Sequence, residues 1–185
     1  MKKQKPDFKA VQLFLTDVDG CLTNGTVYVG KDVEHLGFDI QDGIGHRLAQ
    51  YAGLSVGWIS GRNSESTALR AKKLRVSPVH LGVLDKLKKA QELCRERGLS
   101  LAQVAYLGDD LIDIPLLQKV GWAVAPQNAR PEVKKVVHTV TKAAGGSGAF
   151  REAVERLIKS QGLWDKTVKK FHAMNIEPPG AFRLD

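Results

Sequence analysis

Short apolar runs alternate with helical segments along most of this chain. The run 11–16 is almost continuously apolar, as expected of a strand covered on both faces of a parallel sheet. A helical pattern at 43–51 ends at Gly53, and a second apolar run at 54–60 precedes a basic helix at about 64–75. Because strands that alternate with helices need crossover connections, this order predicts a doubly wound α/β sandwich around a parallel sheet.

The same alternation continues to residue 160. We expect further strands near 78–81, 104–107, 122–125 and 136–140, and helices at about 84–97, through Leu116 and Leu117, and at 149–160. The glycine-rich segment 24–38 contains two β-like pieces, which predict a small hairpin flap. With 185 residues the chain has room for one core. We therefore expect one domain over 1–161 and a tail of little regular pattern over 162–185.

Composition excludes several classes of protein. Hydrophobic residues make up 43% of the chain and charged residues 26%, an ordinary globular balance. Two cysteines, Cys21 and Cys94, cannot form a disulfide framework and favour a reducing compartment. The longest apolar runs fall far short of the roughly 20 residues that span a bilayer. The basic start is followed by an apolar stretch too short for a signal peptide. We expect a soluble, cytoplasmic protein.

The chain is basic, with a formal net charge of +8. That charge favours an anionic partner, which could be nucleic acid, an anionic membrane or a phosphorylated metabolite; scattered lysines can also be no more than a solvated surface. Aromatic residues are only 6% of the chain and do not interleave with a basic stripe. Charge alone therefore decides little among these partners; together with the motifs described below, we expect a small phosphorylated molecule, and neither nucleic acid nor a membrane.

Polar residues follow the predicted strands where each one ends. Asp17 and Asp19 come directly after the first strand, where unpaired buried carboxylates would be costly. Ser60, Gly61 and Arg62 follow the second strand and suit the capture of an anion. Two structural alternatives stay open: the acids can cap amides of a turn, and the second segment can lead into a helix capped by Ser64.

A third acidic group follows the predicted strand 104–107. Asp109, Asp110 and Asp113 lie within five positions of one another and repel each other unless a cation is present, and their hard oxygens suit Mg²⁺. The structural alternative is that these acids lie at the N-terminus of a helix, where the helix dipole favours negative charge. This explains one of the three acids more readily than all three. Lys86 stands near the start of another predicted helix; an exposed, solvated lysine is its plain interpretation.

Taken in chain order, this set resembles the motifs of the haloacid dehalogenase-type phosphatases. Within that superfamily the finer similarity is to the 3-deoxy-manno-octulosonate 8-phosphate phosphatase family, over roughly 11–160. It is carried by the segments 17–25, 38–43, 60–62, 108–113 and 145–149. The resemblance implies a Mg²⁺-dependent phosphatase in which a hairpin replaces a cap domain, assembled as a homotetramer.

The resemblance also implies roles for the acidic and basic residues. Asp17 attacks phosphorus and forms an aspartyl-phosphate, and Asp19 serves as general acid and then general base. The resemblance further implies that Mg²⁺ is bound by Asp17, the Asp19 backbone carbonyl and Asp109. Lys86 and Ser60 are implied to stabilise the phosphate oxygens. Asp113 is implied to orient Lys86 or the metal ligands, and Asp110 to lie behind the residues that bind the metal.

The sugar acid is implied to bind the segment that precedes and opens the first helix, together with basic side chains. The residues that match are Asp39, Ile40, Gln41, Asp42, Gly43, Arg47, Arg62, Arg70 and Lys86. A guanidinium can grip the carboxylate of a 2-keto acid, although Arg47 and Arg70 also suit ordinary exposed helix positions. Gln41 stands where the family often has arginine, which leaves open a nine-carbon ulosonic acid 9-phosphate or a broader phosphatase.

Two further points stay open. The tail 162–185 could cover the active site of a neighbouring subunit, or could be a frayed end. A non-catalytic protein of the same fold that binds nucleic acid through its basic surface is the alternative outside enzymology. The presence of both Asp17 and Asp19 argues against it, because a protein without activity needs neither a nucleophile nor its acid–base partner.

Overall fold

The central strand of the sheet is β1 (Leu13–Thr16), whose residues are all buried. In the computed structural model, which describes residues 5–31 and 33–176, β1 pairs in parallel with β4 (Ser55–Ile59) and with β6 (Val104–Leu107). Its side chains alternate between two hydrophobic clusters: Phe14 belongs to one, and Leu13 and Leu15 to the other. The continuous apolar pattern therefore reflects a strand with a core on each face.

The sheet is parallel throughout, with the order β5-β4-β1-β6-β7-β8. The remaining strands are β5 (Val79–His80), β7 (Trp122–Ala125) and β8 (Thr139–Val140). After β1 the chain builds outward through β4 and β5 and then crosses back to β6 on the other side. This reversal makes the carboxyl edge beside β1 a topological switch point, where open α/β sheets bind their ligands. The predicted doubly wound sheet is confirmed.

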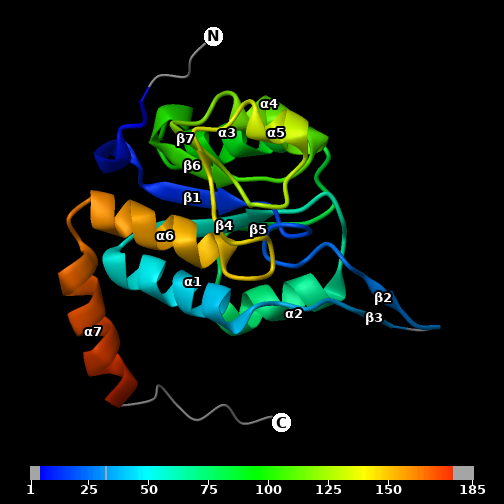
Figure 1. Cartoon of the computed structure of the whole chain (residues 1–185), viewed down its shortest axis with the longest axis horizontal. Coiled ribbons are helices and arrows are strands. Elements are labelled where there is room, and N and C mark those ends of the chain that lie inside the picture. The colour runs from blue at the N-terminus through cyan, green and yellow to red at the C-terminus, as the bar shows by residue number, and fades with distance from the viewer. Residues whose placement is uncertain (1–4, 32, 177–185) are drawn as a thin grey trace.

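Helices cover both faces of the sheet (Figure 1). On one face lie α1 (Ile40–Ala52), α2 (Glu65–Leu74) and α6 (Ala149–Ser160); on the other lie α3 (Lys86–Glu96), α4 (Ile114–Leu117) and α5 (Pro131–Lys134). Short 3₁₀ turns occur at η1 (Phe8–Ala10), η2 (Leu101–Gln103) and η3 (Leu111–Asp113). Helix α1 packs tightly on α6 because Gly45 has no side chain: a Cβ there would lie 3.1 Å from the Cα of Arg151.

The predicted flap is a two-stranded hairpin of β2 (Tyr28–Val29) and β3 (Glu34–His35). It projects away from the sheet (Figure 1), and Tyr28 and Val29 are 61% and 82% exposed. Among the described residues between β1 and α1, this hairpin is the one element of regular structure. No helix of the described chain is long and apolar enough to cross a membrane.

Two predicted boundaries differ from the structure. Helix α1 begins at Ile40 rather than at Gly43, because the Asp39 carboxylate accepts the amides of Gln41 and Asp42 and starts the helix earlier. The prediction of a tail without regular pattern is wrong for α7 (Trp164–Ile176), a helix whose Phe171 ring lies 6.0 Å from Tyr51 of α1. The rest of the tail, residues 177–185, lies outside the described residues.

Candidate active site

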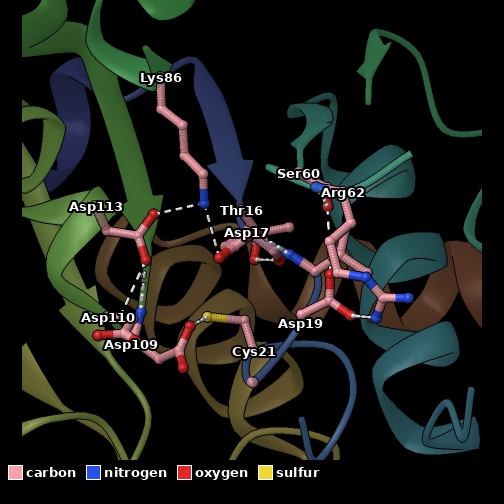
Figure 2. Close-up of polar contacts among 12 residues, drawn as sticks. Thr16, Asp17, Asp19, Cys21, Ser60, Arg62, Lys86, Asp109, Asp110 and Asp113 are labelled. Carbon is pink, nitrogen blue, oxygen red and sulfur yellow. Dashed lines mark hydrogen bonds and ion pairs between the residues drawn. The ribbon is translucent and has the colours of Figure 1, made fainter. Parts of the chain in front are cut away.

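The polar residues predicted at the strand ends meet at the carboxyl edge of the sheet (Figure 2). Asp17 directly follows β1, and its amide donates to the carbonyl of Leu107, 2.9 Å away, which extends the pairing of β1 with β6 by one residue. Its side-chain oxygen Oδ1 accepts the amide of Val18 at 2.7 Å. The Asp17 carboxylate is therefore held at the tip of the central strand, and the residue as a whole is only 6% exposed.

Glycines allow the other segments to approach that strand tip. Gly20 has a φ of +80°, and a Cβ there would lie 2.1 Å from Oδ2 of Asp109. A Cβ at Gly108 would lie 2.6 Å from Asp113, and one at Gly145 would lie 1.7 Å from the carbonyl oxygen of Gly20. The missing side chains let the Asp109 carboxylate and the glycine-rich loop before α6 pack directly on the turn after β1.

Lys86, the first residue of α3, reaches into this site. Its side chain is 1% exposed, and Nζ lies 2.7 Å from Oδ2 of Asp17 and 2.8 Å from Oδ1 of Asp113. Burial alone would lower the pKa of Lys86, but the charges of Asp17 and Asp113 outweigh it and raise the pKa above its ordinary value. The interpretation of Lys86 as a solvated surface lysine is therefore wrong.

The second acid of the pair, Asp19, faces the rim of the site. Its Oδ2 accepts the Ser60 hydroxyl at 3.3 Å, and its Oδ1 lies 3.1 Å from Nη1 of Arg62. The other arm of that guanidinium, Nη2, lies 2.6 Å from Glu34 of β3. Arg62 thereby joins the hairpin to the site. The alternative interpretation of segment 60–62, that it leads into a helix capped by Ser64, is also correct, because Ser64 caps α2.

The carboxylates form a donor set that fits a divalent cation. Asp17, Asp109 and Asp113 each place one oxygen within 4.8 Å of the others. Burial, and then the charge of Asp113, raise the pKa of Asp17 to about 8 despite Lys86, and raise the pKa of Asp109 to about 7. Three carboxylates lie close together beside one ammonium group, that of Lys86, so negative charge is in excess. Hard oxygen ligands with excess negative charge suit Mg²⁺.

Within this set Asp113 is held by the protein itself. Its Oδ1 accepts Lys86 at 2.8 Å and the Tyr106 hydroxyl at 2.5 Å, and its Oδ2 accepts the amides of Asp109 at 2.9 Å and Asp110 at 3.2 Å. Both oxygens of Asp113 therefore already accept hydrogen bonds within the protein, and the orienting role of Asp113 stays a prediction. The Asp110 carboxylate accepts the amide of Leu111 and caps η3.

Comparison with known proteins agrees with this geometry. The family profile described as haloacid dehalogenase-like hydrolase matches residues 64–151. The 3-deoxy-D-manno-octulosonate 8-phosphate phosphatase of Escherichia coli strain K12 is 36% identical over 157 residues, which cover 84% of each chain. The chain belongs to this family of haloacid dehalogenase-like phosphatases. The predicted resemblance is confirmed, and the protein is a phosphatase.

Solved structures of the family have the same fold. A 3-deoxy-D-manno-octulosonate 8-phosphate phosphatase from Moraxella catarrhalis, in complex with magnesium, phosphate and KDO, is 33% identical and superposes with a TM-score of 0.86, covering 89% of this chain and 95% of that one. A cobalt-bound phosphatase from Haemophilus influenzae, also 33% identical, has a TM-score of 0.81 and covers 84% of this chain and 91% of that one.

A cavity of about 180 Å³ opens onto the catalytic edge of this phosphatase. It is lined by Asp17, Asp19, Gly61, Arg62, Lys86, Asp109, Asp110 and Ile112. Most residues predicted to bind the sugar acid lie elsewhere, along α1 and α2. Ile40 is 76% exposed, and Gln41 and Arg47 are exposed as well. Of the predicted sugar-acid residues, the cavity therefore includes Arg62 and Lys86.

Asp42, Gly43 and Arg70 take part in packing within this chain. The Asp42 carboxylate accepts the amide of Arg151 at 2.8 Å and so caps α6, whose own N-cap residue is a glycine. Burial raises the pKa of Asp42 to about 6. The Arg70 guanidinium lies 5.9 Å from the centre of the Phe38 ring. A Cβ at Gly43 would lie 2.8 Å from Nη2 of this guanidinium. Their roles toward a substrate stay predictions.

Sequence reasoning missed three residues that touch the site. Cys21 places its thiol 3.6 Å from Oδ1 of Asp109, Glu34 binds Arg62 from the hairpin, and Tyr106 donates to Asp113. A signal existed for Tyr106, since a tyrosine in a fully buried strand needs a partner for its hydroxyl. Glu34 gave no such signal, because its partner lies 28 positions away on another element.

Proposed function

We propose that this enzyme hydrolyses 3-deoxy-D-manno-octulosonate 8-phosphate to the free sugar acid and inorganic phosphate. The observation that supports it most is the arrangement of Asp17, held by Lys86 and placed beside Asp109 at the switch point of the sheet. The named relatives, which match most of the chain, indicate the substrate.

The reaction follows from the two acids of the pair. Oδ of Asp17 attacks phosphorus, the bond from phosphorus to the sugar oxygen breaks, and Asp19 gives a proton to the departing oxygen. Asp19 then takes a proton from the water that attacks the aspartyl-phosphate, which releases phosphate and restores Asp17. An acid–base role of this kind contributes about 10²–10⁴-fold in rate.

The remaining groups offset the negative charge that gathers around phosphorus. We assign the carboxylates of Asp17 and Asp109 and the backbone carbonyl of Asp19 as the ligands of Mg²⁺, which would neutralise the repulsion between nucleophile and phosphate. We assign Lys86, which lines the cavity, and the Ser60 hydroxyl, which donates to Asp19, to the stabilisation of the phosphoryl oxygens.

The sugar-acid carboxylate is assigned to Arg62, whose guanidinium lines the cavity. The exposed residues of α1, including Gln41 and Arg47, contribute in a homotetramer, where a neighbouring protomer can face them. The hairpin leaves Tyr28, Val29 and Val33 exposed, which supports such an assembly. Helix α7 packs on α1 of its own chain; a contact of the tail with a neighbouring active site stays a prediction, and residues 177–185 lie outside the described residues.

A substrate panel tests this assignment. The purified enzyme is offered octulosonate 8-phosphate, a nonulosonate 9-phosphate and p-nitrophenyl phosphate, each with Mg²⁺ and with EDTA. We expect the highest kcat/KM for the octulosonate ester and loss of turnover in EDTA. Preference for the nine-carbon ester would agree with the presence of Gln41 where the family often has arginine. The proposed substrate would then be a nonulosonate 9-phosphate. Equal rates on all three would identify a broad phosphatase. The proposed location is the cytoplasm, as for an enzyme whose Cys21 and Cys94 are both free and buried.

A further inference from the structure

A tyrosine lies beneath the proposed catalytic groups, on β6, the strand that precedes Asp109. Tyr106 belongs to β6, is fully buried, and packs among the side chains that α3 and α4 cover. Its hydroxyl donates to Oδ1 of Asp113 at 2.5 Å. Tyr106 does not line the cavity, so its route to the reacting groups is through Asp113.

The oxygen that Tyr106 contacts is also the one that holds Lys86. Oδ1 of Asp113 accepts Nζ of Lys86 at 2.8 Å, and the same Nζ lies 2.7 Å from Oδ2 of Asp17. The two donors, Tyr106 and Lys86, share one carboxylate oxygen. The contacts therefore run from Tyr106 in the core through Asp113 and Lys86 to Asp17, and Figure 2 shows the part from Asp113 to Asp17.

We infer that Tyr106 is a positioning residue: its hydroxyl occupies one side of Oδ1 of Asp113 and so keeps the Lys86 ammonium directed at Asp17 and the phosphoryl group. Without the hydroxyl, Oδ1 has a free lone pair and attracts Lys86 more strongly. The ammonium then moves toward Asp113 and away from the reacting oxygens. A misplacement of about 1 Å can cost about 100-fold in the rate of a reaction that depends on preorganised groups.

The hydroxyl suits this role because it remains a donor. Burial, and then the charge of Asp113, raise the pKa of Tyr106 well above its ordinary value, so the phenol keeps its proton. Its ring fills the core as phenylalanine would, which makes Tyr106→Phe a change of one hydrogen bond at nearly constant volume. The inference rests on the proposed role of Lys86 toward the phosphoryl group.

Steady-state kinetics at saturating Mg²⁺ give the first test. We expect Tyr106→Phe to lower kcat about tenfold and to leave KM within about twofold. The assay uses p-nitrophenyl phosphate as well as octulosonate 8-phosphate. If the enzyme does not hydrolyse octulosonate 8-phosphate but does hydrolyse p-nitrophenyl phosphate, the role of Tyr106 can still be tested. Wild-type kcat in Tyr106→Phe, or an effect confined to KM, would overturn the inference.

A double-mutant cycle separates positioning from a general loss of packing. Orthovanadate binding in the presence of Mg²⁺ is measured for wild type, Tyr106→Phe, Lys86→Ala and the double variant. Tyr106→Phe should weaken vanadate binding about tenfold when Lys86 is present and less than twofold in the Lys86→Ala background. An equal loss in both backgrounds would mean a structural defect and would overturn the inference.

Thr139→Val is the matched control. It removes the acceptor of another buried hydrogen bond, from Nε1 of Trp122 on the neighbouring strand, 3.1 Å away. This variant should lose stability and keep wild-type kcat; a tenfold loss of kcat would show that any buried defect in the sheet has this effect. If Tyr106→Phe is destabilised, its kinetics are measured at a temperature at which its circular dichroism matches that of wild type, and the same split between kcat and KM is expected.

Discussion

The two acids of the motif lie two positions apart but occupy opposite environments. Asp17 belongs to a buried half of the site with Lys86 and Asp113, whose side chains are 8%, 1% and 0% exposed. Asp19 belongs to a rim half with Arg62 and Glu34, whose side chains are 24%, 37% and 31% exposed. A nucleophile gains from a fixed position, whereas an acid–base group must exchange its proton with water.

The physics of the two halves differs accordingly. Buried ion pairs are strongly coupled, and removal of one partner leaves an uncompensated charge. Partly exposed pairs contribute little to stability and are screened by salt. The comparison therefore predicts large effects of substitution in the buried half and small, salt-sensitive effects at the rim.

The largest effect is expected for the nucleophile. Asp17→Asn should reduce kcat by at least about 10⁴-fold, because an amide cannot form the covalent intermediate. Circular dichroism should show an intact fold. Asp165→Asn, at an exposed position in the first turn of α7, is the control and should remain within a few-fold of wild type. Turnover by Asp17→Asn near the wild-type rate would remove the proposed nucleophile.

A direct comparison of the halves comes from stability. In EDTA, Lys86→Met should lower the free energy of unfolding by about 3 kcal/mol, since Asp17 and Asp113 lose their shared counter-ion. Arg62→Ala should lower it by less than about 1 kcal/mol. Urea denaturation measures both. Equal losses would contradict the division into a buried and a rim half.

A buried titratable group outside the site extends the comparison to pH. Burial lowers the pKa of His46 from 6.5 to about 4; its ring accepts from Trp58 and lies 2.8 Å from the carbonyl of Asp42. The unfolded chain therefore takes up a proton below pH 6.5 while the folded chain does not. Stability conferred by neutral His46 is present above pH 6.5 and is lost as pH falls toward 4.

This loss amounts to about 2 kcal/mol between pH 7 and pH 5. The raised pKa of Asp42 acts in the opposite direction, so the informative quantity is the difference in slope between wild type and His46→Gln. Unfolding free energies measured at several pH values should fall less steeply for the variant. Identical slopes would mean that His46 titrates normally in the folded protein.

The smallest effect is expected at the rim. Glu34→Gln should change kcat/KM by about threefold at low salt, because it weakens one arm of the Arg62 guanidinium, and the difference should shrink at 0.5 M salt, where the Debye length is about 4 Å. Glu65→Gln, at the start of α2, is the control. A large effect that does not respond to salt would place Glu34 in direct contact with the substrate.

The acids and the Ser-Gly-Arg turn were predictable because they are local. Each follows an apolar strand, and parallel strands bring their carboxyl ends to one edge, so the proximity of Asp17, Asp19 and Asp109 follows from the order of the elements. The hairpin was predictable from its glycines for the same reason. Helix α7 was not predictable, because its sequence shows little periodic apolar pattern and the helix it packs on, α1, is far away in the chain.

The sequence by itself therefore determined the strands, the catalytic edge and the types of residue gathered there, because hydrophobic periodicity and turn chemistry act over a few positions. Only the tertiary structure decided which charged groups are buried. Lys86 and Asp42 look like surface residues in the sequence, yet one is enclosed by two carboxylates and the other caps α6. Burial and partner choice depend on contacts between elements far apart in the chain, and local patterns do not encode those contacts.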